Sequence, residues 1–175
     1  MGASLSWFAV RGKSPEAVLQ EFGLRNVGKE YHDTPFSGGV LPSGWFLIIR
    51  GRHEFTNDEV RRLSRGCEVV ACFVEEHVMV SRAAAWKGGE QIWAVTHDAQ
   101  ESDDHLDVEG EPPPGFISIR DRLTMQQGEN DGVDFIFNIP VGLAKQITGY
   151  SHEDLPEVDF DNFVKPTFLQ RVLGR

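Results

Sequence analysis

The sequence is poor in cysteine and in long apolar runs, and each shortage excludes a class of protein. Its 175 residues include two cysteines, Cys67 and Cys72, which lie close together in one predicted strand and are not expected to pair. No stretch reaches the roughly eighteen apolar residues that a membrane-spanning helix needs, and no apolar leader is recognisable at the N-terminus. We therefore expect a cytoplasmic protein without disulfides and without a membrane partner.

An excess of positive charge is also lacking. The chain has 27 acidic and 17 basic residues, which gives a formal net charge of −10. Such a chain repels phosphate backbones and anionic lipid, so nucleic acid is not an expected partner, whereas a basic protein or a cation is allowed. The excess is local, because residues 98–161 hold most of it, with only Arg120, Arg122 and Lys145 against it.

Two helix starts are marked clearly in the first half. Ser14 followed by Pro15 is typical of an N-cap and a first helical residue, and Gly23 is typical of a left-handed helix end. Residues 56–59, Thr-Asn-Asp-Glu, form a capping box, and Gly66 is placed to end the helix that follows. The pattern predicts two short helices that alternate with strands.

Apolar and β-branched runs predict strands over residues 5–10, 27–32, 45–49, 68–80 and 91–96. Residues 68–80 are either one long strand or two strands joined by a turn at the charged triplet in their middle. Further helices are expected over residues 116–127 and 140–149. The order indicates an α+β fold. We expect a mixed or antiparallel sheet with helices mainly on one face, in a ferredoxin-like or related βαββαβ order, followed by hairpin strands and two C-terminal helices.

The domain organisation follows from the same pattern. Residues 1–150 are expected to form a single α+β domain, and at this length one core can bury most of the chain. Residues 151–175 interleave acidic and apolar side chains and are expected to form an acidic C-terminal tail that docks on the domain.

No catalytic signature passes a test of its spacing. Gly12, Lys13 and Ser14 lie between a strand and a helix, as in a phosphate-binding loop, but the glycine that such a loop needs five residues earlier is replaced by Trp7. The segment is better explained as a helix N-cap. An enzyme is therefore the less favoured class.

The triplet Glu75, Glu76 and His77 interrupts an apolar strand. Strand alternation places Glu75 and His77 on one face, where a carboxylate and an imidazole can share a proton or a metal ion. The alternative is a charged turn that faces solvent.

A second polar group follows the predicted strand over residues 91–96. His97, Asp98, Asp103, Asp104 and His105 lie within nine residues, and mixed nitrogen and oxygen ligands suit zinc, manganese or nickel. His97, Asp98 and His105 are the candidate ligands. The alternative is an acidic loop without a metal, which is the commoner origin of such a pattern.

Trp86 and Trp93 flank a predicted hairpin turn at Gly88 and Gly89. They could meet across the hairpin as an aromatic pair. Packing in the sheet is the favoured interpretation, and the alternative is an exposed platform that anchors a partner.

Two functions are compatible with these residues. The favoured one is a non-catalytic protein interaction module without a cofactor, of the kind by which small acidic bacterial proteins neutralise a basic toxin. Its binding candidates are Trp86, Trp93, Asp103 and Asp104. The alternative is a metal-assisted hydrolase with a divalent metal ion at Glu75, His77, His97 and Asp98, if the strands that carry them are neighbours.

Overall fold

The two marked helix starts form as their caps require. In α1 (Pro15–Phe22) the Ser14 side chain accepts a hydrogen bond from the backbone N–H of Ala17, and Gly23 ends the helix in the left-handed conformation. In α2 (Asn57–Leu63) the capping box is complete, with Thr56 and Glu59 each accepting from the other's backbone. Both predicted starts are confirmed because caps act through residues a few positions apart. The predicted end at Gly66 is not, since α2 ends at Leu63 with Ser64 as its C-cap.

The structure, a computed structural model, describes residues 2–29, 34–129, 132–154 and 159–166. The further helices are α3 (Gly115–Glu129) and α4 (Asn138–Thr148). The strands are β1 (Ser4–Arg11), β2 (Arg25–Gly28), β3 (Phe36–Val40), β4 (Phe46–Gly51), β5 (Glu68–Glu75), β6 (Val80–Lys87), β7 (Glu90–Asp98), β8 (Asp107–Gly110) and β9 (Asp161–Val164). No described helix is both long enough and apolar enough to span a membrane.

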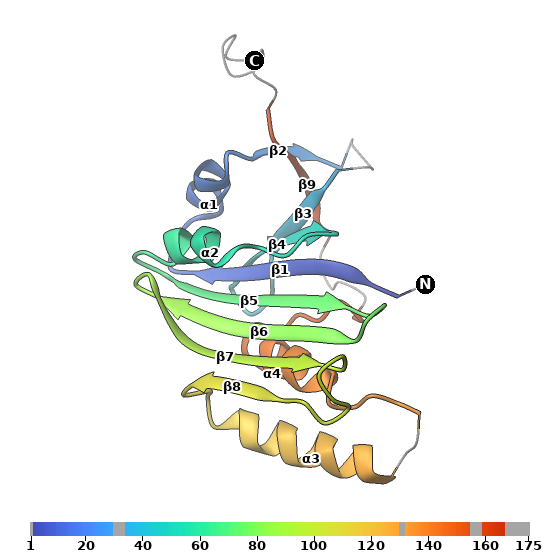
Figure 1. Ribbon diagram of the computed structural model, residues 1–175. Helices are drawn as coiled ribbons and strands as arrows, with labels where there is room; N and C mark the ends of the chain where they lie inside the picture. The colour runs from blue at the N-terminus through green and yellow to red at the C-terminus, as the bar shows by residue number, and fades with distance from the viewer. Residues whose placement is uncertain (1, 30–33, 130–131, 155–158, 167–175) are drawn as a thin grey trace.

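All nine strands belong to one antiparallel sheet in the order β2-β9-β3-β4-β1-β5-β6-β7-β8 (Figure 1). The α+β class and the antiparallel sheet are as expected. The ferredoxin-like order is not confirmed, since β1 pairs antiparallel with both β4 and β5, whereas a βαβ unit sets its two strands parallel. From β5 to β8 each strand pairs with the next through a simple turn or loop.

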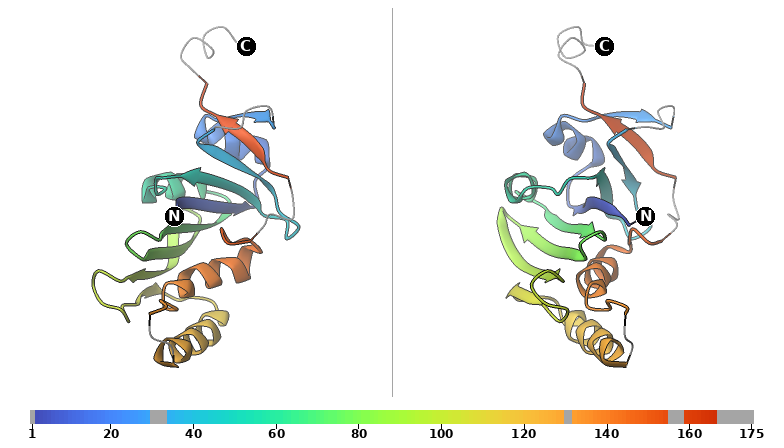
Figure 2. Two further views of the ribbon diagram at one scale, coloured as in Figure 1. Left: turned by 90° about the vertical axis from the view of Figure 1, so that its right-hand side faces the viewer. Right: turned by 45° about the vertical axis from the view of Figure 1, so that its right-hand side comes forward.

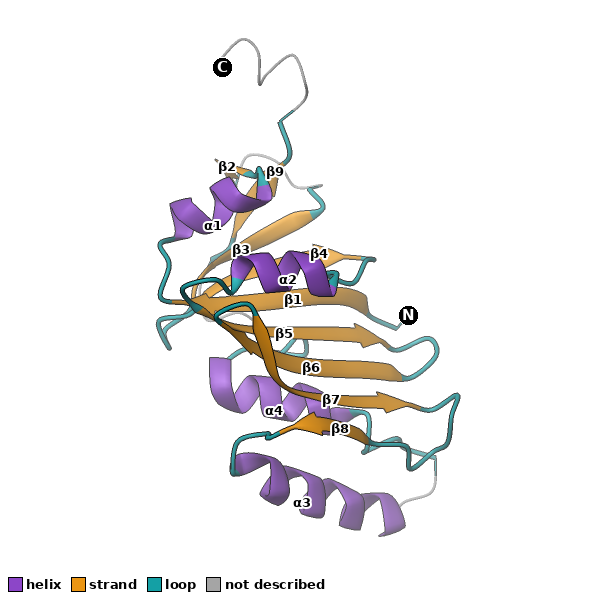
Figure 3. Cartoon of the chain, turned by 60° about the vertical axis from the view of Figure 1, so that its left-hand side comes forward, coloured by secondary structure: helices purple, strands orange, loops and turns teal. Residues whose placement is uncertain are grey.

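The helices divide between the two faces of the sheet, so the expectation of helices mainly on one face is wrong. Figures 2 and 3 show α1 and α2 on one side and α3 and α4 on the other. The physical reason is visible in β1. Trp7 and Ala9 join the core beneath α3 and α4, while Phe8 and Val10 join the core beneath α1 and α2, and all four are buried. A strand that is apolar on both faces needs a cover on both.

Part of the expected tail belongs to the sheet. β9 lies between β2 and β3, with Phe163 opposite Asn26 on one side and Phe36 on the other. Residues 155–158 and 167–175 of that tail, and residues 30–32 of the predicted second strand, lie outside the described residues. Both cysteines are buried and free, as expected.

Candidate binding surface

The edge strand β8 and the loop before it carry the most acidic segment of the chain. We call residues 98–111 the acidic loop; it starts where β7 ends and includes all of β8. Of the strands that the structure describes, β8 pairs with β7 alone, and it lies at the end of the sheet order. The segment therefore forms one edge of the sheet.

The acidic loop contains seven carboxylates and no lysine or arginine, and the next basic residue along the chain is Arg120. They are Asp98, Glu101, Asp103, Asp104, Asp107, Glu109 and Glu111. All are exposed except Asp98, which is half-buried. Within the described part of the chain none of the seven takes part in an ion pair. Unopposed charges at this density give a strongly negative local potential.

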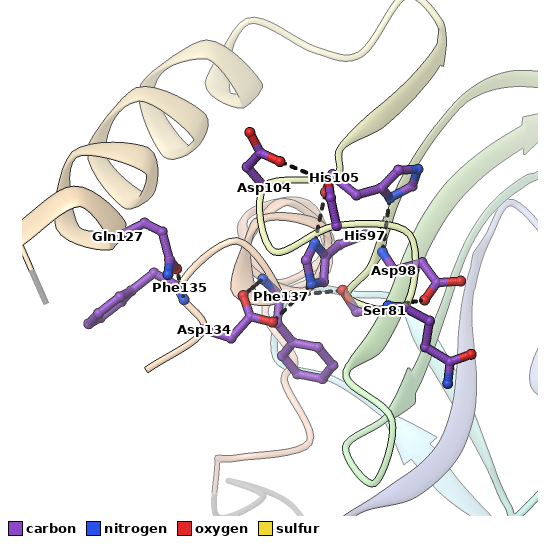
Figure 4. Close-up of polar contacts among 11 residues, drawn as sticks. Ser81, His97, Asp98, Asp104, His105, Gln127, Asp134, Phe135 and Phe137 are labelled. Carbon is purple, nitrogen blue, oxygen red and sulfur yellow. Dashed lines mark hydrogen bonds and ion pairs between the residues drawn. The ribbon is translucent and has the colours of Figure 1, made fainter. Parts of the chain in front are cut away.

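Two histidines hold the loop in place (Figure 4). His97, on β7, is completely buried, and its Nδ1 lies 2.7 Å from the backbone oxygen of His105. The Nδ1 of His105 accepts a hydrogen bond of 3.0 Å from the backbone N–H of Asp98. These two bonds tie the start of the acidic loop to His105, and the pairing of β8 with β7 holds the rest, so its carboxylates project from an ordered backbone.

Asp134 completes this network from the far side of His97. Its Oδ2 lies 2.9 Å from Nε2 of His97, and its Oδ1 accepts from the backbone N–H of Phe137 at 3.0 Å. Ser81, on β6, donates to the backbone oxygen of Phe137 at 2.7 Å. The network therefore ties β6, β7 and the acidic loop to the segment that leads into α4.

His97 has a structural role in this arrangement, because both of its ring nitrogens are engaged in contacts within the protein. Both ring nitrogens face oxygen acceptors, so both contacts are hydrogen bonds only when each nitrogen carries a proton or the carboxyl of Asp134 carries one. Each nitrogen is occupied and the ring is fully buried. No ring atom is left to bind a metal ion or a substrate.

Glu75 and His77 do lie together, at the turn between β5 and β6. Nδ1 of His77 is 2.7 Å from Oε1 of Glu75, and the His77 side chain is largely exposed. A hydrogen bond from Ser4 and the contact with His77 lower the pKa of Glu75. The interpretation as two strands with a charged turn is confirmed, since β5 ends at Glu75 and β6 begins at Val80.

The structure does not bring together the four residues of the metal-assisted alternative. Glu75 and Asp98 flank Val80 on opposite sides, so two strand spacings, about 10 Å, separate their backbones. His97 is in register with Ser81, and hence with Val74 in the core beneath α4, so its side chain lies on the opposite face of the sheet from Glu75. Among the described residues no three histidine, cysteine or acidic side chains are grouped to hold a metal ion.

Trp86 and Trp93 pack in the cores of the sheet, as the favoured interpretation has it, but they do not meet as a pair across the hairpin. Each is 4% exposed, and they belong to the cores on opposite faces of the sheet. A bulge is the cause: Gln91 opposes Trp86 and Trp93 opposes Ala85, so one extra residue lies between them on β7 and turns Trp93 to the other face. Being buried, neither tryptophan is placed to anchor a partner. Asp103 and Asp104 are exposed at the tip of the acidic loop.

Sequence reasoning missed two polar partnerships. One is Asp134 with His97, for which the only signal is an aspartate shortly before a helix, a common cap position. The other joins Glu76 to the nearly buried side chain of His152, at 3.1 Å, and to the backbone N–H of Ala3, at 2.6 Å. Neither partner could be named from sequence, because the pairs lie far apart along the chain.

Comparison with protein-family models, with curated proteins and with solved structures gave no match to this chain. The function has to be inferred from the geometry of the surface itself.

Proposed function

We propose that the protein is a non-catalytic interaction module that binds a basic partner protein through the acidic loop. The observation that carries the proposal is the set of seven carboxylates at the sheet edge without an ion pair among the described residues. A partner with lysine and arginine side chains would supply the missing counter-charges and would be steered toward this edge by long-range attraction.

The fixed backbone of the loop supports the same proposal. A binding surface that is already ordered loses less conformational entropy when the partner docks. His97 provides that order, because its ring is buried and bonded to the loop at one nitrogen and to Asp134 at the other. A protein that neutralises a basic toxin is the form of this module that we favour, since masking of a cationic surface requires the opposite charge in a defined place.

The test compares the protein with two charge-matched variants. In the loop variant, four acids without a side-chain partner among the described residues are made neutral. They are changed as Glu101→Gln, Asp103→Asn, Asp107→Asn and Glu111→Gln. In the control variant, four exposed acids elsewhere are made neutral. They are changed as Glu16→Gln, Glu90→Gln, Glu129→Gln and Glu153→Gln.

Each protein is immobilised and exposed to lysate of its own source cells, and retained proteins are identified and then purified for binding kinetics. We expect the wild type and the control to retain a basic protein whose association rate falls steeply with added salt. The loop variant should lose it. Equal retention by all three proteins, or a retained partner that is not basic, would contradict the proposal.

A further inference from the structure

A cleft between α1 and α2 gathers positive charge, although the chain as a whole is acidic. The two helices lie next to each other on one face of the sheet (Figures 1 and 3). The cleft has a volume of about 370 Å³. Its apolar lining comes mainly from Phe22, since Leu63 behind it is buried, and its basic lining comes from Lys13, Arg62 and Arg65.

Lys13 is held rigidly in this cleft. Its Nζ lies 2.7 Å from Oε1 of Glu21 and 2.7 Å from the backbone oxygen of Leu63, and its side chain is only 16% exposed. These contacts use two of the ammonium N–H bonds, so one remains free. The cleft thus contains a cation whose position is fixed before any ligand arrives.

Arg62 and Arg65 lie at the C-terminal end of α2 and just beyond it. Both are exposed, and neither side chain has a hydrogen-bond or ion-pair partner among the described residues. The other basic residues nearby do have partners, since Arg61 pairs with Asp58, and Arg11 and Lys87 share Glu68. The attraction of cations to a helix C-terminus accounts for Arg62 in the last turn but not for Arg65, which follows the helix.

The carboxylates of the cleft do not neutralise these two arginines. Glu21 is bonded to Lys13. Glu59 accepts from the backbone and side chain of Thr56 in the capping box and lies 3.5 Å from Arg50. Both acids are therefore engaged, and the guanidinium groups remain available to an incoming anion.

We propose that this cleft binds a small phosphate-bearing ligand, with the phosphate among Lys13, Arg62 and Arg65. A phosphate offers several strong acceptor oxygens, which suit two planar guanidinium forks and a fixed ammonium better than a single carboxylate does. The cleft is larger than a phosphate alone, and the half-buried ring of Phe22 provides an apolar contact for the organic part of the ligand.

The cleft shares no lining residue with the acidic loop. Its residues come from α1, α2 and the segments next to these helices, whereas the acidic loop consists of the edge strand β8 and the residues around it. The two proposals therefore concern different sites.

Isothermal titration calorimetry with pyrophosphate and with O-phosphoserine, at constant ionic strength set by sodium chloride, tests the proposal. We expect saturable binding of one ligand per chain, and a loss of about tenfold or more in affinity in the double variant Arg62→Gln, Arg65→Gln. The matched control is Arg25→Gln, Arg122→Gln, which removes two exposed arginines that also lack a partner among the described residues. It should bind as the wild type does.

Because the exchanged arginines are exposed, both double variants should unfold at the wild-type temperature, which thermal unfolding without ligand checks. Lys13→Gln provides a second, single-site variant that should also weaken binding. An equal loss in the control, or no saturation by either probe up to about 10 mM, would overturn the proposal. Binding of a glutamate-rich peptide without binding of either phosphate probe would overturn it in favour of a protein ligand.

Discussion

Removal of the carboxylate of Asp134 should destabilise the protein far more than its position outside the helices suggests. In Asp134→Ala the Nε2 of His97 loses its partner, and because the ring is 0% exposed, water cannot replace it. A lost hydrogen bond to a charged group costs about 1.5–3 kcal/mol, and the freed N–H of Phe137 adds about 1 kcal/mol. We therefore expect the free energy of unfolding to fall by about 3 kcal/mol, or the melting temperature by about 6–12 °C.

Asp134→Asn separates this reasoning from a general effect of mutation. Its amide can accept from Phe137 with the oxygen and donate to His97 with the nitrogen, provided that the imidazole is neutral and keeps its proton on Nδ1 for His105. We expect a cost below about 1 kcal/mol. Asp121→Ala is the control, since this carboxylate is 61% exposed and pairs only with its neighbour Arg120, and it should cost less than about 0.5 kcal/mol.

Urea unfolding of the three variants, followed by tryptophan fluorescence, measures these differences directly. The reasoning is refuted if Asp134→Ala is as stable as Asp121→Ala, or if Asp134→Asn is as unstable as Asp134→Ala. In the first case His97 would not depend on this carboxylate, and in the second the charge rather than the bonding pattern would be required.

Two more substitutions test the packing and the charges of the sheet. In Gly38→Ala the new Cβ would lie 1.9 Å from the backbone oxygen of Leu47, so thermal unfolding should show a loss of about 3 kcal/mol in stability or no folded protein. In the control Gly39→Ala the nearest atom to the new Cβ, on Phe160, is 3.5 Å away, so this variant should melt near the wild-type temperature. Equal melting temperatures of the two variants would contradict the clash. The hydrogen bond from the N–H of Ala3 lowers the pKa of Glu76 below its ordinary value. The charged carboxylate therefore stabilises the folded state at pH values above that ordinary pKa, and this contribution is lost as the pH falls through the lowered pKa. Glu76→Gln should therefore flatten the decline of unfolding free energy between about pH 5 and pH 3 in urea titrations, and a curve parallel to the wild type would argue against the contact.

The elements that the sequence predicted well are those whose signals are local. Ser14, Gly23 and the capping box at Thr56 act within one helical turn, so their helices begin where the residues indicate. The acidic loop was recognisable for the same reason, because its composition is continuous along the chain. Signals that lie within a few residues of one another therefore predict the two helix starts and the acidic segment, and the structure contains all three.

The elements that escaped prediction depend on distant residues or on a single insertion. The bulge on β7 is one residue long, yet it reverses the face of Trp93. His97 meets Asp134 from a segment 37 residues away. Lys13 lies next to the predicted and observed N-cap Ser14, but Leu63, whose backbone oxygen accepts a hydrogen bond from its ammonium, is 50 residues further along the chain. No spacing within a short window contains such information.

The position of β9 determines which part of the sheet should unfold locally first. Among the described strands β2 pairs with β9 alone, and the Asn26 side chain bonds to Asp161 across a separation of 135 residues. Strand pairings between residues so far apart form late in folding, because closing the long intervening chain costs conformational entropy before the pairing stabilises the protein. We expect the amide protons of residues 25–28 to exchange with solvent before those of β1, because β1 is hydrogen-bonded to a strand on each side. The pair of β2 and β9 should therefore open locally while the rest of the sheet stays intact.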